Sequence, residues 1–141
     1  RMAKKGLLLI NLGSPDDPSP KSVARYLRQF LNDPYVIDIP AWLRFLLVNV
    51  IIAPTRSPKS AEAYQQIWTN NGSPLVHTTR IFARKLWEAM GTEWNVRWAM
   101  RYGSPSIASA MKDFPPASEI YVVPLYPQYA QSSTQTAIDQ V

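Results

Sequence analysis

The sequence predicts an α/β fold with three layers, in which helices cover both faces of a parallel sheet. Short apolar runs recur along the chain, and this pattern is typical of strands buried on both faces. Amphipathic helical segments separate these runs. Because strand–helix–strand units cross over with a right-handed turn, the strands are expected to be parallel. With 46% hydrophobic and 18% charged residues in a chain of 141, the composition suits one folded domain.

The first strand is predicted over residues 5–11, an apolar run that is followed by Gly13-Ser14-Pro15. A helix should come next, because Ser19 can cap it and Pro20 suits its first position. Apolar residues then recur at helical spacing until Asn32-Asp33-Pro34 ends the helix.

Residues 39–55 are the most apolar stretch of the chain. They are too short for a membrane-spanning helix, which needs about 20 residues, and Arg44 and Asn49 interrupt them. Ser57-Pro58 is then expected to open a helix from about Lys59 to Trp68.

The second half of the chain repeats the alternation of helix and strand. After a turn at residues 70–74, a helix is predicted from about Leu75 to Met90 and a strand over residues 95–102. Ser104-Pro105 should start a helix to about Asp113, and residues 119–124 form the third predicted strand. Ligands of parallel sheets bind beyond the carboxyl ends of the strands, so the loops at 11–15, 101–105 and 125–133 are expected to line a site.

Several kinds of site are absent from the sequence. The chain has no cysteine, so it supplies no disulfide, no zinc–cysteine site and no ligand to an iron–sulfur cluster. One glycine in residues 11–15 is too few for a dinucleotide-binding loop. His77 is the only histidine, so packing or a place on the helix surface is favoured over catalysis. The net charge of +5 leaves nucleic acid, anionic lipid and carboxylate ligands as classes of partner.

The amino end of the chain lacks the pattern of a signal peptide, and the carboxyl end predicts that the chain is part of a longer protein. The apolar run after the basic residues 1–5 is shorter than the roughly 7–15 residues of a signal-peptide core. Residues 132–141 have the pattern of a helix that begins without a stop signal. We therefore expect residues 1–141 to form one lobe.

Four motifs follow one another along the sequence: Asn11-Leu12-Gly13-Ser14-Pro15, then Arg56-Ser57-Pro58-Lys59 with Tyr64 and Gly72-Ser73-Pro74, then Arg101-Tyr102, and finally Tyr126-Pro127-Gln128-Tyr129 before Ser132-Ser133-Thr134. In this order they resemble the ferrochelatase family, whose patterns are N-x-G-x-P, R-[ST]-P-K with a tyrosine and G-S-P, R-Y, and Y-P-Q-Y. The resemblance runs from about Lys5 to the last residue. It implies the amino-terminal lobe of the chelatase-like, Rossmann-like fold.

The family's activity is a lyase reaction of haem biosynthesis, the insertion of Fe²⁺ into protoporphyrin IX. The resemblance implies these two substrates and no cofactor held by this chain. It also carries substrate-binding positions onto this sequence: Leu12 beside the macrocycle, Arg56, Tyr64 and Ser73 at a propionate, Arg101 and Tyr102 at the pocket floor, and Tyr126 in the pocket. Each has a plainer interpretation as well, such as a solvated cation for Arg56 and a core residue for Tyr64.

Residues Trp42 to Ile52 match the family's lip at the pocket mouth. The resemblance therefore implies a cytoplasmic protein at the periphery of the inner membrane. The same residues equally suit a wall of the porphyrin slot, or burial against a second lobe or the domain core.

The family's essential histidine and its acidic partner lie in a second lobe that this chain lacks, and His77 does not align with that histidine. We assign no catalytic base and no metal ligand to this chain, and we expect the fragment alone not to insert metal. One alternative is the lobe of a cobalt or nickel chelatase. Another is a basic nucleic-acid-binding domain, which is disfavoured because the Lys and Arg residues form no continuous stripe.

Overall fold

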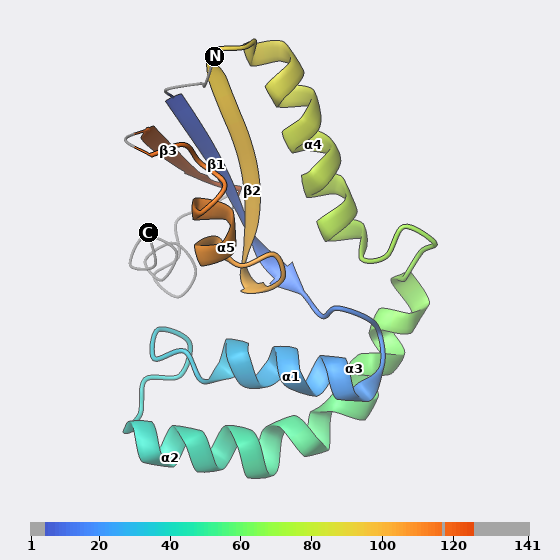
Figure 1. Ribbon diagram of the computed structural model, residues 1–141. Helices are drawn as coiled ribbons and strands as arrows, with labels where there is room; N and C mark the ends of the chain where they lie inside the picture. Colours follow the sequence, from blue (N-terminus) through green and yellow to red (C-terminus); the bar gives the residue numbers. More distant parts are fainter. Residues whose placement is uncertain (1–4, 117, 126–141) are drawn as a thin grey trace.

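The computed structural model describes residues 5–116 and 118–125 (Figure 1). The strands are β1 (Lys5–Ser14), β2 (Trp94–Gly103) and β3 (Glu119–Pro124). The α-helices are α1 (Pro20–Leu31), α2 (Ala41–Leu46), α3 (Ala53–Ile67), α4 (Pro74–Met90) and α5 (Ile107–Met111). A π-helical segment, η1 (Leu47–Ile52), joins α2 to α3.

The strands form one parallel sheet in the order β2-β1-β3, as the sequence predicts. The central strand β1 is apolar on both sides, and Leu7 lies opposite Val96 of β2 and Tyr121 of β3. Side chains of a strand alternate between the two faces of a sheet, so each face of β1 receives its own set of leucine and isoleucine side chains.

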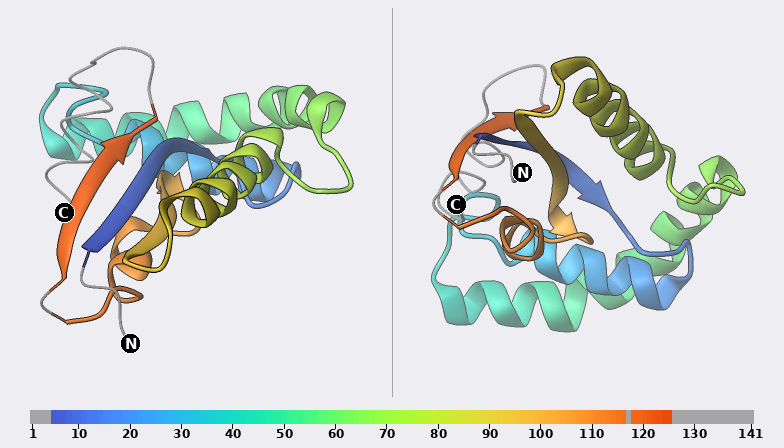
Figure 2. Two further views of the ribbon diagram at one scale, coloured as in Figure 1. Left: turned by 90° about the horizontal axis from the view of Figure 1, so that it is seen from above. Right: turned by 45° about the horizontal axis from the view of Figure 1, so that its top comes forward.

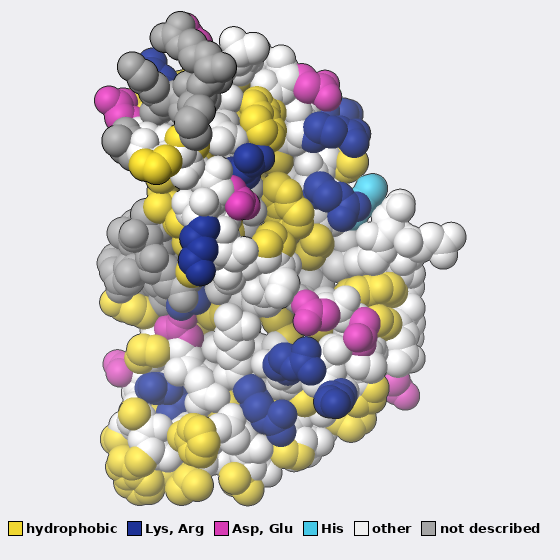
Figure 3. Space-filling model, in the orientation of Figure 1, with side chains coloured by type: hydrophobic (Ala, Val, Ile, Leu, Met, Phe, Trp, Pro, Cys, Tyr) yellow, Lys and Arg dark blue, Asp and Glu magenta, His cyan; other side chains and the backbone are white. Residues whose placement is uncertain are grey.

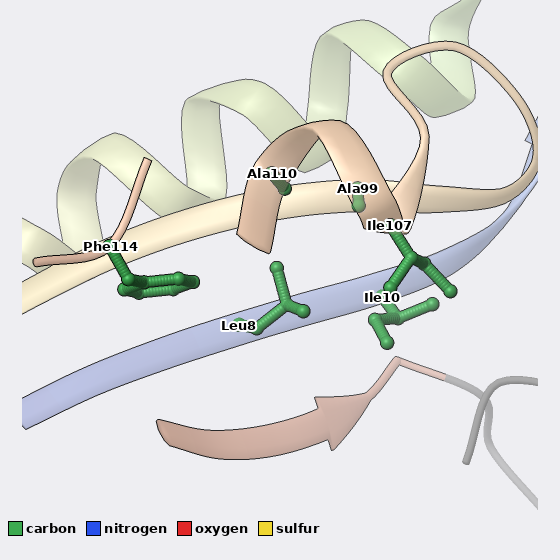
Figure 4. Close-up of a cluster of buried hydrophobic side chains, with 6 residues drawn as sticks. All are labelled: Leu8, Ile10, Ala99, Ile107, Ala110 and Phe114. Atoms are coloured by element: carbon green, nitrogen blue, oxygen red, sulfur yellow. The ribbon is translucent and has the colours of Figure 1, made fainter. Parts of the chain in front are cut away.

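Each face of the sheet packs against a different helix. Leu8 and Ile10 lie in the cluster with α5, which Figure 4 shows together with Ala99, Ile107, Ala110 and Phe114. Leu7 and Leu9 lie in the cluster with Ala83 of α4 on the opposite face. Full burial of such side chains stabilises the fold by about 1.5–3 kcal/mol each. The two clusters make β1 the centre of the core.

The architecture has the three predicted layers, with α4 and α5 on opposite faces of the sheet. The helix pair formed by α1 and the α2–η1–α3 run lies apart from these layers, at the carboxyl ends of β1 and β2 (Figures 1 and 2). A ligand bound beyond the strands would therefore face α1 and α3.

Helix α1 begins as the sequence predicts. Pro20 is its first residue, and the Ser19 side chain accepts a hydrogen bond from the backbone N–H of Ser22 at 3.3 Å. This side-chain cap satisfies one of the amide groups that the first turn leaves unpaired.

The predicted start of a helix at Ser57-Pro58 is wrong, because α2, η1 and α3 run on without an extended residue between them. Pro58 lies inside α3. A proline in a helix interior costs about 3 kcal/mol in isolation. Here the buried Ala53, Ser57 and Ala61 recur once per turn on the side of α3 that packs along α1, and this tertiary packing outweighs the missing hydrogen bond.

One further helix boundary differs from the prediction. Helix α5 begins at Ile107, because Ser106 and not Ser104 provides the cap, accepting from the N–H of Ser109 at 3.1 Å. No helix among residues 5–116 and 118–125 has the length and apolar character that crossing a bilayer requires.

The carboxyl ends of β1 and β2 approach each other closely at two glycines with positive φ. A Cβ on Gly13, whose φ is +133°, would lie 1.9 Å from the backbone oxygen of Tyr102. A Cβ on Gly103 would lie 2.6 Å from the backbone oxygen of Ser14. Only glycine combines this backbone conformation with such proximity.

We predict that Gly13→Ala lowers the free energy of unfolding by about 3 kcal/mol or more, since it adds a backbone clash to an unfavourable φ. The matched control is Gly72→Ala, where φ is +88° and nothing lies within 4 Å of the added Cβ. That variant should lose only about 1–2 kcal/mol. Urea denaturation of the three proteins measures both values, and equal losses would contradict the prediction.

Candidate functional site

The candidate site is centred on a buried carboxylate between α1 and the end of β2. Asp33 follows α1 and is 6% exposed. One of its oxygens, Oδ2, accepts from the Arg101 guanidinium at 2.5 Å and from the Tyr102 hydroxyl at 2.9 Å. The other oxygen, Oδ1, accepts from the backbone N–H of Tyr35 at 2.8 Å. The carboxylate is thus bonded on both oxygens, as a buried charge requires.

These contacts give Arg101 and Tyr102 a structural role within the described residues. The Arg101 guanidinium also lies over the Tyr102 ring, 4.5 Å from its centre. Tyr102 is 1% exposed, and its hydroxyl donates to Asp33. The predicted pair therefore holds α1 against β2, and its contact with a ligand stays a prediction.

Asp33 is a residue that the sequence analysis missed. The segment Asn32-Asp33-Pro34 was interpreted only as a helix stop, and the partners of Asp33 lie almost seventy residues further along. The sequence gives two separate signals, an acidic residue after the first helix and an Arg-Tyr pair near the end of the second strand. Nothing in their spacing shows that these residues pair with each other.

Aromatic side chains continue from this node along α1. The Phe30 ring meets the Tyr102 ring edge to face, with centres 4.9 Å apart, and Tyr26 stacks on Phe30 at 6.3 Å. Such pairs contribute about 0.5–1.5 kcal/mol each beyond the area that they bury. They form an aromatic ridge on the side of α1 that faces the strand end.

Tyr64 of α3 reaches the same region. Burial raises the pKa of Tyr26 well above its ordinary value, and the phenols of Tyr64 and Tyr102 raise it further. Burial also raises the pKa of Tyr64, which is half-buried and meets the Trp68 ring edge to face at 6.3 Å. Both phenols therefore stay protonated at neutral pH and remain able to donate a hydrogen bond to a carboxylate.

Arg56 lies on α3 about two turns before Tyr64 and is exposed. It neighbours Ser57, which is buried against α1. The exposed Arg56 guanidinium and the protonated Tyr64 phenol, both on α3, offer donors of the kind that bind a carboxylate.

Leu12 lies near the end of β1 and is 39% exposed. Asn11 beside it is fixed by its side chain, which donates to the Thr79 hydroxyl of α4 at 3.2 Å and accepts from the N–H of Leu12 at 2.9 Å. Leu12 thus presents an apolar surface at the carboxyl edge of the sheet, and the hydrogen bonds of Asn11 fix its backbone.

Two sequence-predicted residues lie at the start of α4. Ser73, predicted to bind a propionate, is 7% exposed and occupies the position before Pro74. His77 accepts a hydrogen bond on Nδ1 from the Arg80 guanidinium at 2.9 Å. Among residues 5–116 and 118–125, no group of three or more His, Asp or Glu side chains could hold a metal ion. Tyr126 and the rest of the fourth motif lie outside the described residues.

The segment 42–52, which we call the lip segment, presents apolar side chains to solvent. Trp42 is 67% exposed, Phe45 59% and Val50 64%. Asn49 on its other side binds the Asn32 amide at 3.0 Å, which ties the segment to the end of α1. Arg44 turns inward and donates to the backbone oxygen of Ile39 at 3.2 Å. The lip segment is therefore an exposed apolar ridge beside the candidate site, and hydrogen bonds fix its position.

Comparison with known proteins identifies relatives over nearly the whole chain. The family model described as Ferrochelatase matches residues 4–141. A ferrochelatase of Coxiella burnetii (strain Dugway 5J108-111) is 46% identical over 140 residues, which is 98% of this chain and 40% of that protein. A ferrochelatase of Legionella pneumophila (strain Corby) is 44% identical over 137 residues, 97% of this chain and 41% of that protein. The chain thus spans about two fifths of the length of these curated relatives.

We predict that Asp33→Asn destabilises the fold by about 3–5 kcal/mol, because it removes the buried carboxylate charge that pairs with the Arg101 guanidinium. Asp16→Asn is the control, since Asp16 pairs with Arg25 at 3.5 Å while both side chains are more than half exposed. That change should cost about 0–1 kcal/mol. Unfolding in urea at neutral pH compares the two, and a similar small loss for both would show that the buried pair does not hold α1 to β2.

Proposed function

The chain belongs to the ferrochelatase family, and from this premise we propose that a protein containing it inserts Fe²⁺ into protoporphyrin IX. In that reaction the metal forms bonds to four pyrrole nitrogens and two N–H protons leave. The protein must hold a flat apolar macrocycle, bind its propionates and remove the two protons. We assign the first two tasks to this chain.

The observation that carries this proposal is the convergence of α1, α3 and the end of β2 on one edge of the sheet. Tyr64 of α3 and Tyr102 of β2 both act on the pKa of Tyr26 of α1, and α3 packs along α1, so residues from two of the motifs share one region with α1. Leu12 comes to this carboxyl edge on β1. Parallel sheets bind their ligands at this edge.

In the proposed pocket, Arg56 and Tyr64 bind a propionate and Leu12 lies against the macrocycle. The guanidinium supplies the charge and the protonated phenol supplies a second donor. Arg101 and Tyr102 form the pocket floor, with Asp33 fixing their orientation. We assign Ser73 and Tyr126 to the same pocket on the motif match alone. The family match supports a ferrochelatase and gives no support to the alternative of a cobalt or nickel chelatase.

The proton-accepting base is not assigned to this chain. Its only histidine, His77, receives a hydrogen bond from Arg80 on α4. The Asp33 carboxylate already accepts hydrogen bonds from Arg101 and Tyr102. We therefore propose that this chain binds porphyrin without inserting metal by itself.

We also propose that the lip segment contacts a membrane surface, so that the apolar substrate passes between bilayer and pocket. Its support is the exposure of Trp42, Phe45 and Val50 on consecutive turns of one helical run. Aromatic and aliphatic side chains of this kind bury readily in the interface of a bilayer.

We expect protoporphyrin IX to quench the tryptophan fluorescence of the purified chain, and Arg56→Ala to weaken binding about tenfold through loss of a charge-assisted hydrogen bond. Lys85→Ala is the matched control, because Lys85 is also an exposed cation but lies on α4. Its affinity should stay within about twofold of the unmodified chain. Equal affinities of the two variants would refute the assignment of Arg56 to a propionate.

The lip proposal is tested by co-sedimentation with vesicles of phosphatidylglycerol and phosphatidylcholine. Replacing Trp42 and Phe45 together by serine should lower the bound fraction at least about tenfold, because each buried aromatic side chain contributes roughly 1.5–3 kcal/mol. Phe82→Ser is the control, since Phe82 is 46% exposed but lies on α4. If the control loses as much binding, the lip segment is not the membrane contact.

A further inference from the structure

A groove runs along the outer edge of β2, away from the candidate site. Strand β2 is the edge of the sheet that the described residues form. Two adjoining hollows of about 390 and 640 Å³ lie beside it, and both are lined by Trp87, Arg97 and Asp113. We call the two together the edge groove. Figure 3 shows this face, with Lys and Arg side chains on both sides of exposed hydrophobic ones between α4 and α5.

The main chain of β2 faces this groove. The backbone oxygen of Trp94 accepts from the Trp87 indole at 2.8 Å, and the N–H of Met100 donates to the backbone oxygen of Pro105 at 2.8 Å. Both groups therefore point away from β1. Because a strand repeats every two residues, the N–H and C=O groups of Val96 and Trp98 point outward as well. We find no partner for them within residues 5–116 and 118–125.

Two side chains on the same strand also have polar atoms without a partner among the described residues. Asn95 is 8% exposed, and its Oδ1 is buried and accepts no hydrogen bond. The Nε of Arg97 is buried and donates none. A buried polar atom left unpaired costs about 1–3 kcal/mol.

The open edge at Val96 and Trp98 offers both N–H donors and C=O acceptors to a partner. A phosphate or a simple carboxylate supplies acceptors only. Consecutive peptide groups of an extended chain supply both, and they also match the free edge at Val96 and Trp98. The chemistry of the groove thus favours a peptide over a small anion.

The charge of the groove determines which peptide fits. Arg80 and Arg84 line it from adjacent turns of α4, and Arg97 lies over the Trp87 ring at 4.8 Å. Asp113 is the acidic side chain in the lining. Cations on both sides of an open strand edge favour a partner with carboxylates.

We propose that the edge groove binds an acidic peptide segment in extended conformation, as a further strand beside β2. Acidic side chains on one face of the segment pair with Arg80 and Arg84 of α4 and with Arg97, which lies over the Trp87 ring. The apolar side chains between them point to the α5 side of the sheet, where Pro105 and Ala110 line the groove. The groove follows residues 94–98 of β2, whereas the candidate site lies beyond its carboxyl end. The proposal therefore does not rest on porphyrin binding.

The test uses the purified 141-residue chain and a fluorescein-labelled hexapeptide in which glutamate and valine alternate. Fluorescence anisotropy should show saturable binding of this peptide, at least about tenfold weaker binding of its lysine–valine counterpart, and a similar loss when alternate backbone nitrogens of the acidic peptide are methylated. Methylation removes strand hydrogen bonds without changing charge. Strand addition is refuted if the methylated peptide binds as well as the unmethylated acidic peptide. It is also refuted if inorganic phosphate, at the same concentration of negative charge, displaces the acidic peptide.

Substitutions in the chain provide a second arm. Arg84→Ala should weaken binding of the acidic peptide about tenfold, and because Arg84 is exposed on α4 the change should leave the fold intact. Arg97→Ala should weaken it at least as much. The neighbouring Lys85→Ala, outside the groove lining, should change the affinity less than about twofold. Equal effects of Arg84→Ala and Lys85→Ala would overturn the proposal, and circular dichroism confirms that each variant is folded.

Discussion

The buried pair of Asp33 and Arg101 is the contact on which the geometry of the candidate site depends. It joins the end of α1 to the end of β2, and the Tyr102 hydroxyl shares the same carboxylate oxygen. A second tie runs from the N–H of Gly103 to the Gln29 side chain at 2.9 Å. Helix α3 packs along α1, so the position of Arg56 and Tyr64 relative to the sheet follows from these ties. A pair that contributes little net stability can still select one arrangement of helices, because the alternatives leave a charge buried and unpaired.

The strand ends must be close for this arrangement to form. Gly13 passes next to the backbone oxygen of Tyr102, and Gly103 passes next to that of Ser14. Side chains at either glycine would push the ends of β1 and β2 apart and would move Arg101 away from Asp33. The glycine in the first motif therefore serves the strand contact, and its neighbour Leu12 is left to present an apolar surface.

Local patterns predicted the sheet well, because a buried parallel strand leaves a clear apolar run. The third strand, residues 119–124, was predicted to the residue, and the Ser19 cap and Pro20 start of α1 were confirmed. The predicted helix start at Ser57-Pro58 was wrong, since the continuation of α3 through Pro58 depends on how α3 packs on α1 and not on local preference. Asp33 was missed for a related reason. Its role comes from partners that are distant in sequence, and no periodicity reports such a pair.

Strand β2 is held at both ends by different contacts, and this separates the two surfaces that it serves. Its carboxyl end is fixed by Asp33 through Arg101 and Tyr102, and its amino end by the Trp87 indole at the backbone oxygen of Trp94. An added strand at Val96 and Trp98 would form hydrogen bonds on the side opposite β1 and would leave the contact between Trp87 and Trp94 in place. Occupation of the edge groove should therefore leave the carboxyl edge unchanged, because a ligand shifts an equilibrium only where it binds two states differently.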